Sequence, residues 1–393
     1  MTSRPTVLLT DYAWPDNAIE AELLEDAGFR LIAGPAKAAS ADAITALAAE
    51  HQPAAIMTNW APVSAAAIAA TPPLRVVARL GVGLDNIAVD EATRRGIWVT
   101  NVPDYSVEEV SDHAVAMLLA CARGLTHYDR EVRAGRWDPA DAKLRRVRDL
   151  TCGIIGFGRT GRRTAEKLRG FGVRLLAHTR RPVADAGDVE MTTLDELLRR
   201  SDAVIVQVPL TADTRHMLDR ERIALMKPGA FLVNVSRGAV IENQALIDAL
   251  EAGRLAGAGL DVLEGEPHVP PGLLRPNVVL TPHIAFSSDA SLRDVRRKAS
   301  EDVIRALRGE RPLQARNEPQ PRLPRDTLER LSYLLGIYKA LQLLLPDTHA
   351  ADDWIRRPNE APLFGGKSAL ERMLSGNVAD LYTVRQYLDA QRG

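Results

Sequence analysis

Short apolar runs of strand length alternate with longer helical patterns along the first hundred residues. Runs typical of strands lie at residues 7–10, 29–33, 54–58, 75–80 and 97–100, and the stretches between them, several rich in alanine, have helical spacing. Strands that alternate with helices in this way form a parallel sheet covered by helices. The sequence therefore predicts a first α/β domain.

A second series of the same kind follows a long apolar-striped helix predicted over residues 106–123. Strand patterns occur at residues 152–155, 173–177, 203–208, 230–235, 258–262 and 278–280, with helical patterns at 194–198 and 243–250. This series predicts a second parallel sheet, inserted into the first domain. A helix over residues 291–307 would return the chain to that domain.

The composition changes after residue 308. Residues 309–324 are rich in proline and charge, and residues 327–345 repeat leucine at helical spacing with no strand pattern after them. The predicted fold class is α/β, with two doubly wound parallel-sheet domains and a small all-α C-terminal domain. We place the first domain at residues 1–101 and 288–316, the second at 102–287, a linker at 317–325 and the helical domain at 326–393.

Charge and cysteine content narrow the functional classes. The chain has 50 basic and 51 acidic side chains, so its overall charge gives no reason to expect a nucleic-acid or membrane partner. Its two cysteines, Cys121 and Cys152, lie in apolar surroundings and form no disulfide framework, and no metal site is expected. The longest apolar run, residues 114–122, is too short to span a bilayer. These features predict a cytoplasmic protein.

A glycine-rich turn follows the strand predicted at residues 152–155. Its glycines have the spacing Gly156-x-Gly158-x-x-Gly161, and a helical pattern begins at once. A turn of this kind lets backbone amides at a helix N-terminus approach a pyrophosphate. The alternative is a glycine-rich turn in an unrelated α/β unit. The predicted cofactor-binding turn comprises Gly156, Phe157, Gly158, Arg159, Thr160 and Gly161.

The end of the next strand bears on the choice of cofactor. A carboxylate that would bind the ribose hydroxyls of NAD is expected there, but the sequence has Thr179, Arg180 and Arg181 after His178. Guanidinium groups suit a 2′-phosphate, so NADP is favoured over NAD. The alternative is that these arginines belong to a solvated loop.

Another glycine-containing loop follows the strand at residues 75–80. It reads Gly81-Val82-Gly83, and exposed backbone amides in such a turn can hold a carboxylate. The alternative is an ordinary turn before a short helix. If the loop binds an anion, the amides of Val82 and Gly83 are the candidates.

Three polar residues follow strands of the second domain, at the sheet edge where ligands bind. They are Arg237, Glu266 and His283. An arginine can hold the carboxylate and carbonyl of a 2-oxo acid, a histidine can exchange the hydroxyl proton, and a glutamate can orient the imidazole. Two alternatives stay open: Glu264 competes with Glu266, and Arg237 could form an ion pair with Glu242.

Five motifs in order resemble the D-isomer-specific 2-hydroxyacid dehydrogenase family across residues 1–316. They are RLGVGLDNI (79–87), GIIGFGRTG (153–161), VNVSRGAVI (233–241), GLDVLEGEP (259–267) and LTPHIA (280–285). The first motif and NVPDYSVEEVSDHA (101–114) are most similar to the branch that includes the C-terminal-binding-protein corepressors. The family usually has an Asp where this chain has Thr179.

The resemblance implies a flavodoxin-like substrate domain, a Rossmann NAD(P) domain and a set of residue roles. It implies that Arg237 binds substrate, that His283 is the acid/base, that Glu266 is its partner and that Val82 and Gly83 hold the carboxylate. It also implies cofactor contacts by Val208, Pro209, Val235, Asp261 and His283, and a homodimer. Trp60, Tyr105 and Trp137 are candidates for lining the substrate pocket.

The C-terminal residues resemble a different family. RLSYLLGIYKALQLLLP (330–346), WIRRPNEAPLFGGKSALERMLSG (354–376) and VRQYLDAQRG (384–393) are similar to the toxin-binding domain of MbcA/ParS/Xre antitoxins. That resemblance implies a RES-type toxin as partner through residues 326–393, without DNA binding. The alternative is a helical dimerisation appendage.

The combined prediction is an NADP- or NAD-dependent oxidoreductase of a small 2-oxo or D-2-hydroxy acid, with an added protein-binding module. A second hypothesis is a cofactor-sensing scaffold or antitoxin that binds a toxin through its C-terminal domain. The intact Arg237, Glu266 and His283 favour the enzyme, because a scaffold has no need of them.

Overall fold

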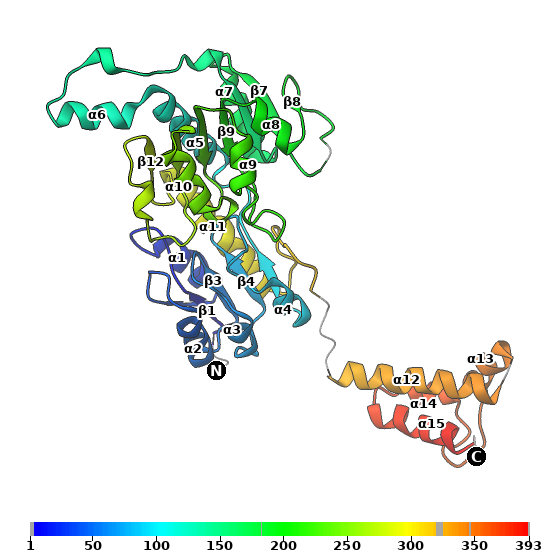
Figure 1. The fold of residues 1–393 in the computed structure, drawn as a ribbon. Helices are drawn as coiled ribbons and strands as arrows, with labels where there is room; N and C mark the ends of the chain where they lie inside the picture. Colours follow the sequence, from blue (N-terminus) through cyan, green and yellow to red (C-terminus); the bar gives the residue numbers. More distant parts are fainter. Residues whose placement is uncertain (1–3, 182, 320–324, 346, 392–393) are drawn as a thin grey trace. The chain divides into compact units, whose positions relative to one another are not determined.

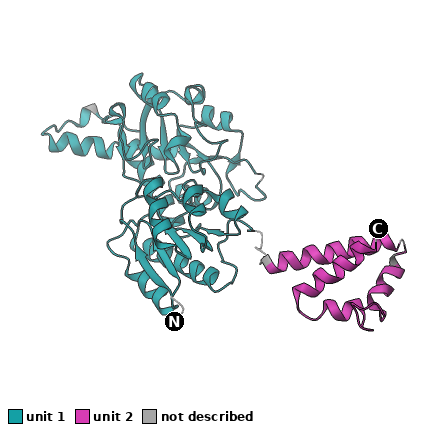
Figure 2. Ribbon diagram, turned by 90° about the horizontal axis from the view of Figure 1, so that it is seen from below, with its two compact units in different colours: residues 1–319 teal, residues 320–393 magenta. Residues whose placement is uncertain are grey.

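The computed structural model of the chain describes residues 4–181, 183–319, 325–345 and 347–391. The chain divides into two compact units, Met1–Pro319 and Gln320–Gly393, which Figure 2 shows in two colours. The first unit contains both parallel sheets, and the second is helical.

The first sheet has five parallel strands in the order β2-β1-β3-β4-β5 (Figure 1). This is the flavodoxin-like order, and it confirms the predicted doubly wound first domain. Strands of such a sheet are covered on both faces, so they appear in the sequence as continuous apolar runs. The strands are β1 (Thr6–Leu9), β2 (Arg30–Ala33), β3 (Ala55–Thr58), β4 (Val76–Arg79) and β5 (Trp98–Thr100), and the helices between them are α1 (Ala18–Asp26), α2 (Ala41–His51), α3 (Ala65–Ala69) and α4 (Val89–Arg94).

The second sheet has seven parallel strands in the order β12-β11-β10-β9-β6-β7-β8. The order reverses between β6 and β9, and such a switch point opens a crevice for a ligand at the carboxyl ends of the strands. The strands are β6 (Thr151–Ile155), β7 (Arg174–His178), β8 (Glu190–Met191), β9 (Ala203–Val206), β10 (Ala230–Asn234), β11 (Leu255–Leu260) and β12 (Val278–Leu280). The helices are α5 (Val107–Arg123), α6 (Leu125–Arg133), α7 (Arg159–Arg169), α8 (Leu194–Arg200), α9 (Arg220–Leu225) and α10 (Asn243–Glu251), with 3-10 turns at Pro139–Asp141, Val147–Asp149, Gly238–Val240 and Pro271–Leu273.

Two long helices connect the domains. Helix α5 packs on α7 and on β10 and β11 of the second sheet, and α11 (Asp289–Leu307) returns the chain to α1 and β4 of the first. Helix α11 begins with a capping box between Ser288 and Ser291. It is held to α1 by Arg296, whose guanidinium lies 2.7 Å from the fully buried Glu20 carboxylate. The helix predicted over residues 291–307 is thereby confirmed.

Two elements differ from the sequence prediction. Residues 125–133 form helix α6, which the patterns along the chain did not predict because most residues of this helix are polar and none of them is buried. Strand β8 was missed because it is a two-residue strand at the edge of the sheet, with both residues exposed.

The chain after α11 stays attached to the first sheet as far as residue 317. The backbone amide of Arg316 donates to the carbonyl of Val99, and the Asn317 side chain accepts from the amide of Val99 at 2.8 Å. Residues 309–317 are therefore held by β5, although their proline and charge content is typical of a linker. Of the predicted linker at 317–325, residues 320–324 lie outside the described residues.

The second unit comprises α12 (Arg325–Leu344), α13 (Thr348–Arg356), α14 (Ala369–Met373) and α15 (Val378–Ala390). Its core is closed by Phe364, whose ring lies edge-on to Trp354 at 6.0 Å and to Tyr387 at 5.1 Å. The predicted all-α domain is therefore confirmed. Among the helices that the structure describes, none has the length and apolar content needed to cross a membrane.

Candidate active site

The loop after β4 places backbone amides at the carboxyl edge of the first sheet. A side chain at Gly83 would put its Cβ 2.0 Å from Nη2 of Arg237, so only glycine leaves room for that guanidinium. Val82 and Gly83 both line the cavity between the sheets. The structure therefore brings the predicted anion-binding amides next to the predicted substrate arginine.

Arg237 follows β10 and reaches across to the first domain. Its Nε lies 3.2 Å from Oδ1 of Asp85, and its Nη1 donates to the carbonyl of Ser236 at 2.8 Å. Two of its five donors are thus engaged, and the remaining ones are available to a ligand. The partner is Asp85 from the first domain and not Glu242, so the ion pair considered from sequence is wrong.

His283 forms a close pair with Glu266. Its Nδ1 lies 2.7 Å from Oε1 of Glu266, while the other carboxylate oxygen accepts from the amide of Leu263 at 3.2 Å. A carboxylate acceptor assigns the proton to Nδ1 and leaves Nε2 for proton exchange with a ligand. Burial alone would raise the pKa of Glu266, but the hydrogen bond and charge of His283 outweigh it and lower that pKa.

The rival carboxylate, Glu264, belongs to a separate pair. Its two oxygens lie 2.9 Å from Nε2 of His216, and Arg215 approaches one of them at 3.3 Å. The structure therefore decides which glutamate accompanies His283, a choice that spacing left open.

Asp261 fixes the backbone around His283. It is only 2% exposed, and its carboxylate accepts from the amides of Ile284 and Ala285 and from the hydroxyl of Thr281 at 2.9, 3.0 and 2.6 Å. The backbone at His283 has a φ of +54°, a left-handed conformation that residues other than glycine rarely adopt. The carboxylate holds the turn that gives the imidazole its direction.

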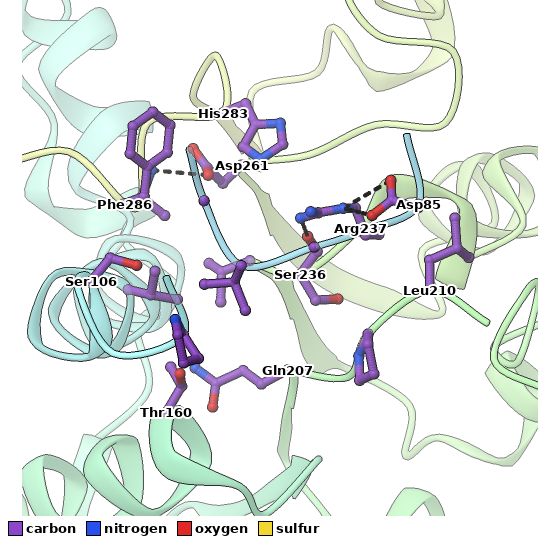
Figure 3. Close-up of a pocket in the computed structure, with 18 of the residues that line it drawn as sticks. Asp85, Ser106, Thr160, Gln207, Leu210, Ser236, Arg237, Asp261, His283 and Phe286 are labelled. Atoms are coloured by element: carbon purple, nitrogen blue, oxygen red, sulfur yellow. Dashed lines mark hydrogen bonds and ion pairs between the residues drawn. The ribbon is translucent and has the colours of Figure 1, made fainter. Parts of the chain in front are cut away.

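A cavity of about 630 Å³ joins these groups to the glycine-rich turn. Figure 3 shows His283, Asp261 and Arg237 toward one end of it and Thr160 and Gln207 toward the other. The predicted residues that line it are Val82, Gly83, Thr160, Val208, Pro209, Val235, Arg237, Asp261 and His283. Glu266 lies in an adjoining cavity of about 760 Å³ that shares Arg237, Asp261 and His283.

The turn after β6 is shaped for a dinucleotide. A Cβ at Gly161 would lie 2.0 Å from the carbonyl oxygen of Gly156, whereas a Cβ at Gly158 would meet no atom within 4 Å. Gly161 thus lets α7 approach the strand, and the space beside Gly158 at the start of α7 is open for phosphate. These residues fit a nicotinamide dinucleotide. Of this turn, Thr160 lines the cavity, and Phe157 is buried with Arg162 over its ring at 4.8 Å.

The predicted 2′-phosphate residues lie beyond the end of β7 and outside the cavity lining. Arg180 approaches Asp213 at 3.2 Å, with both side chains more than 70% exposed, and Arg181 is also exposed. An ion pair this exposed contributes little, so Arg180 is easily redirected to an anion. Thr179 is half-buried beside them.

Sequence reasoning missed several residues at the site. Arg79, at the end of β4, is 6% exposed, lines both cavities, and donates to the side chain of Asn59 at 2.8 Å. Its burial lowers its pKa to about 10. Asp85 lies within the motif at residues 79–87, and Phe286 directly follows the motif at residues 280–285, but neither residue was singled out. Of the three candidate aromatics, Trp60 and Tyr105 line the cavity, and Trp137 is 83% exposed instead.

Comparisons with known proteins agree with this geometry. Residues 115–285 match the sequence profile described as "D-isomer specific 2-hydroxyacid dehydrogenase, NAD binding domain". Residues 340–393 match "Antitoxin Xre/MbcA/ParS C-terminal toxin-binding domain". The chain is 43% identical to a glyoxylate reductase of Pyrococcus furiosus over 252 residues, which are 61% of this chain and 75% of the relative. It is also 43% identical to a glyoxylate reductase of Korarchaeum cryptofilum over 260 residues, 64% and 78% of the two chains.

Solved structures extend the similarity over the whole first unit. An NADPH-dependent glyoxylate/hydroxypyruvate reductase from Sinorhizobium meliloti, in complex with NADP and malonate, matches with a TM-score of 0.73 and 33% identity, covering 82% of this chain and 100% of that one. A D-lactate dehydrogenase from Aquifex aeolicus, with NAD and lactic acid, matches with a TM-score of 0.70 and 29% identity over 77% and 96%. The chain therefore belongs to the D-isomer specific 2-hydroxyacid dehydrogenase family, as a nicotinamide-dependent oxidoreductase of 2-oxo or 2-hydroxy acids that carries an antitoxin-type C-terminal domain.

Proposed function

We propose that the first unit reduces a 2-oxo acid to the D-2-hydroxy acid, with His283 as the proton donor. The observation that carries this assignment is the 2.7 Å pair between Nδ1 of His283 and Glu266, beside Arg237 at the cavity that reaches Thr160. Glu266 stabilises the protonated imidazole, and Nε2 is left to deliver the proton to the substrate oxygen.

Arg237 and the loop at residues 82–83 hold the substrate. Arg237 has donors left for the carboxylate and for the oxygen on which negative charge develops, and the amides of Val82 and Gly83 bind the other carboxylate oxygen. The bound nicotinamide supplies the hydride in this family's reaction. Val235 and Asp261, which line the cavity, are the proposed contacts to its ring, and Val208 and Pro209 lie nearer the turn.

We infer a preference for NADP. The supporting observation is that the end of β7 presents Thr179, Arg180 and Arg181, with Arg180 in an exposed pair with Asp213. Two guanidiniums suit a 2′-phosphate and leave the ribose hydroxyls of NAD without a carboxylate acceptor. Replacing Arg180 and Arg181 together by alanine should lower the NADPH to NADH ratio of kcat/KM by about tenfold or more. An unchanged ratio would contradict the preference.

We also propose that the protein is a cytoplasmic homodimer. Helix α6 buries none of its residues, and Leu125, Val132 and Trp137 of this region are 60%, 48% and 83% exposed. Exposed apolar side chains gathered on one projecting segment are typical of an interface. Both cysteines are unpaired, which supports a reducing compartment. Light scattering on the full chain checks the mass, and a monomer would contradict the dimer.

The second unit favours a second function, the binding of a RES-type toxin. The supporting observations are the antitoxin-type match at residues 340–393 and an exposed apolar face on α12, where Leu328, Leu331, Leu335 and Tyr338 are each more than 40% exposed. Co-purification of such a toxin with the full chain tests this proposal. Leu335→Asp should weaken that binding without changing reductase turnover.

Reductase activity is tested directly by oxidation of NADPH and NADH with a panel of 2-oxo acids. His283→Ala should lower kcat by roughly 10²- to 10⁴-fold while the cofactor still binds. Near-normal turnover of this variant would exclude His283 as the proton donor. Tight cofactor binding without turnover of any acid by the unaltered chain would favour a cofactor-sensing scaffold.

A further inference from the structure

Aromatic rings surround His283 on the side that faces the first domain. The ring centroids of Trp60 and Phe286 lie 6.4 and 6.3 Å from the imidazole, and these two rings lie 6.2 Å from each other. The ring centroid of Tyr105 lies 6.3 Å from that of Phe286. These rings come from segments far apart in the sequence and form a continuous aromatic wall, here defined as Trp60, Tyr105 and Phe286.

The polar groups of the site limit where a substrate side chain can go. The carboxylate is directed to Arg237 and the amides at residues 82–83, and the reacting oxygen must lie within reach of Nε2 of His283. The dinucleotide comes from the side of Thr160 and Val208, which belong to the second domain. The direction that remains for the substrate side chain leads from the reacting carbon toward Trp60, since the indole ring of Trp60 lies beside the imidazole of His283.

Open space continues past this point in the adjoining cavity of about 760 Å³. Arg79, Asp85 and Asn86 line it beside the polar groups already described, and the rest of its lining is Trp60 together with apolar residues of the loop that carries Glu266 and of other segments. These residues are Ala38, Leu263, Pro267, Val269, Leu280 and Pro282. Such a lining contacts an apolar substrate side chain, and a substrate without a side chain would leave it unused.

We propose that the preferred substrate is a 2-oxo acid with a bulky apolar side chain, branched or aromatic, which packs on Trp60 in this adjoining cavity. The assignment rests on the proposed reductase function and adds the substrate class to it. Each methylene of a substrate side chain that such a pocket buries raises kcat/KM by roughly tenfold or more, so the pocket favours acids with a larger apolar side chain. Glyoxylate has no side chain, so its kcat/KM gains nothing from this cavity.

The first test is a series of kcat/KM values with NADPH for glyoxylate, pyruvate, 4-methyl-2-oxopentanoate, phenylpyruvate and 2-oxoglutarate. We expect 4-methyl-2-oxopentanoate or phenylpyruvate to exceed glyoxylate by about tenfold or more. A maximum at glyoxylate would overturn the assignment while leaving the reductase function intact. A maximum at 2-oxoglutarate would also overturn it and would point to the buried Arg79 as a site for a second carboxylate. Failure of every acid would instead contradict the reductase function.

The second test uses variants of the aromatic wall. Trp60→Ala should lower the ratio of kcat/KM for phenylpyruvate to that for glyoxylate by about tenfold, and Trp60→Leu should restore part of it because leucine keeps apolar area. Phe171→Ala is the matched control, since Phe171 is an exposed aromatic residue outside both cavities. An equal ratio in Trp60→Ala and Phe171→Ala would overturn the role of Trp60. Cofactor binding by each variant checks that it is folded.

Discussion

At the residue scale, two polar pairs join side chains from different parts of the chain at the candidate site. One joins His283 to Glu266 within the second domain, and the other joins Arg237 to Asp85 across the cleft. In each pair the carboxylate contacts only some of the nitrogen atoms of Arg237 or His283, so other nitrogen atoms of these side chains face the cavity. Replacing the carboxylate of each pair therefore tests the role of its partner.

Glu266→Gln should lower kcat for reduction by about tenfold or more, because the amide cannot balance the charge of the protonated imidazole. In the unaltered chain kcat should fall as the pH drops through the pKa of Glu266, and the variant should lose this acid limb of the pH–rate profile. The pKa of Glu266 is lowered, so its charge is present through the neutral range and is lost only as the pH falls through that lowered value. A variant profile that keeps this acid limb would contradict the pairing. Glu264→Gln is the matched control.

Asp85→Asn should raise KM for the 2-oxo acid more than it lowers kcat. The carboxylate holds Nε of Arg237 at 3.2 Å, and an amide would still accept a hydrogen bond but would position the guanidinium less firmly. We expect an increase in KM of about three- to tenfold. Steady-state kinetics across the 2-oxo acid concentration check this, and unchanged kinetics would show that Arg237 is positioned without Asp85.

At the scale of single elements, the turn between β6 and α7 separates two uses of glycine. Gly161 is needed for close packing, because its Cβ would lie 2.0 Å from the Gly156 carbonyl. Gly158 has open space around it, and that space is where a phosphate would lie. The same residue type thus serves the fold at one position and the ligand at the other.

Gly158→Ala should leave the melting temperature nearly unchanged and weaken cofactor binding by about tenfold or more, because the added methyl group faces the ligand. Gly161→Ala should lower the melting temperature by several degrees, since the backbone must shift to accept it. Thermal unfolding and cofactor titration of both variants check this contrast. A stable Gly161→Ala variant that binds the cofactor normally would contradict it.

The contact between α1 and α11 depends on a buried ion pair. Arg296 donates to the fully buried Glu20, so removing the cation leaves an uncompensated carboxylate. Arg296→Ala should lower the free energy of unfolding of the first unit by about 3–5 kcal/mol. Arg293→Ala, on the same helix, removes only an exposed pair with Asp289 and should cost about 1 kcal/mol or less. Urea denaturation of both variants checks the difference.

At the scale of the whole molecule, the chain combines two units with separate cores. The cavities with the candidate residues Arg237, Glu266 and His283 lie entirely within residues 1–319, and the helical core is formed by residues of the second unit alone. A chain ending at Pro319 should therefore keep kcat and KM within about twofold of the full chain. Steady-state kinetics of the two proteins check this, and a large loss of turnover in the shorter chain would show that the second unit contributes to catalysis.

The sequence by itself predicted both parallel sheets, the glycine-rich turn after β6 and the candidates Arg237 and His283, because these depend on local periodicity and on motifs at the ends of strands. Helix α6 escaped prediction because most of its residues are polar and none of them is buried in a core. Only the tertiary structure decided that Glu266 and not Glu264 accompanies His283, and that Arg237 pairs with Asp85. It also brought Trp60 and Phe286, more than two hundred residues apart in sequence, against one imidazole. Such contacts depend on how two domains meet, and no spacing along one chain segment encodes that.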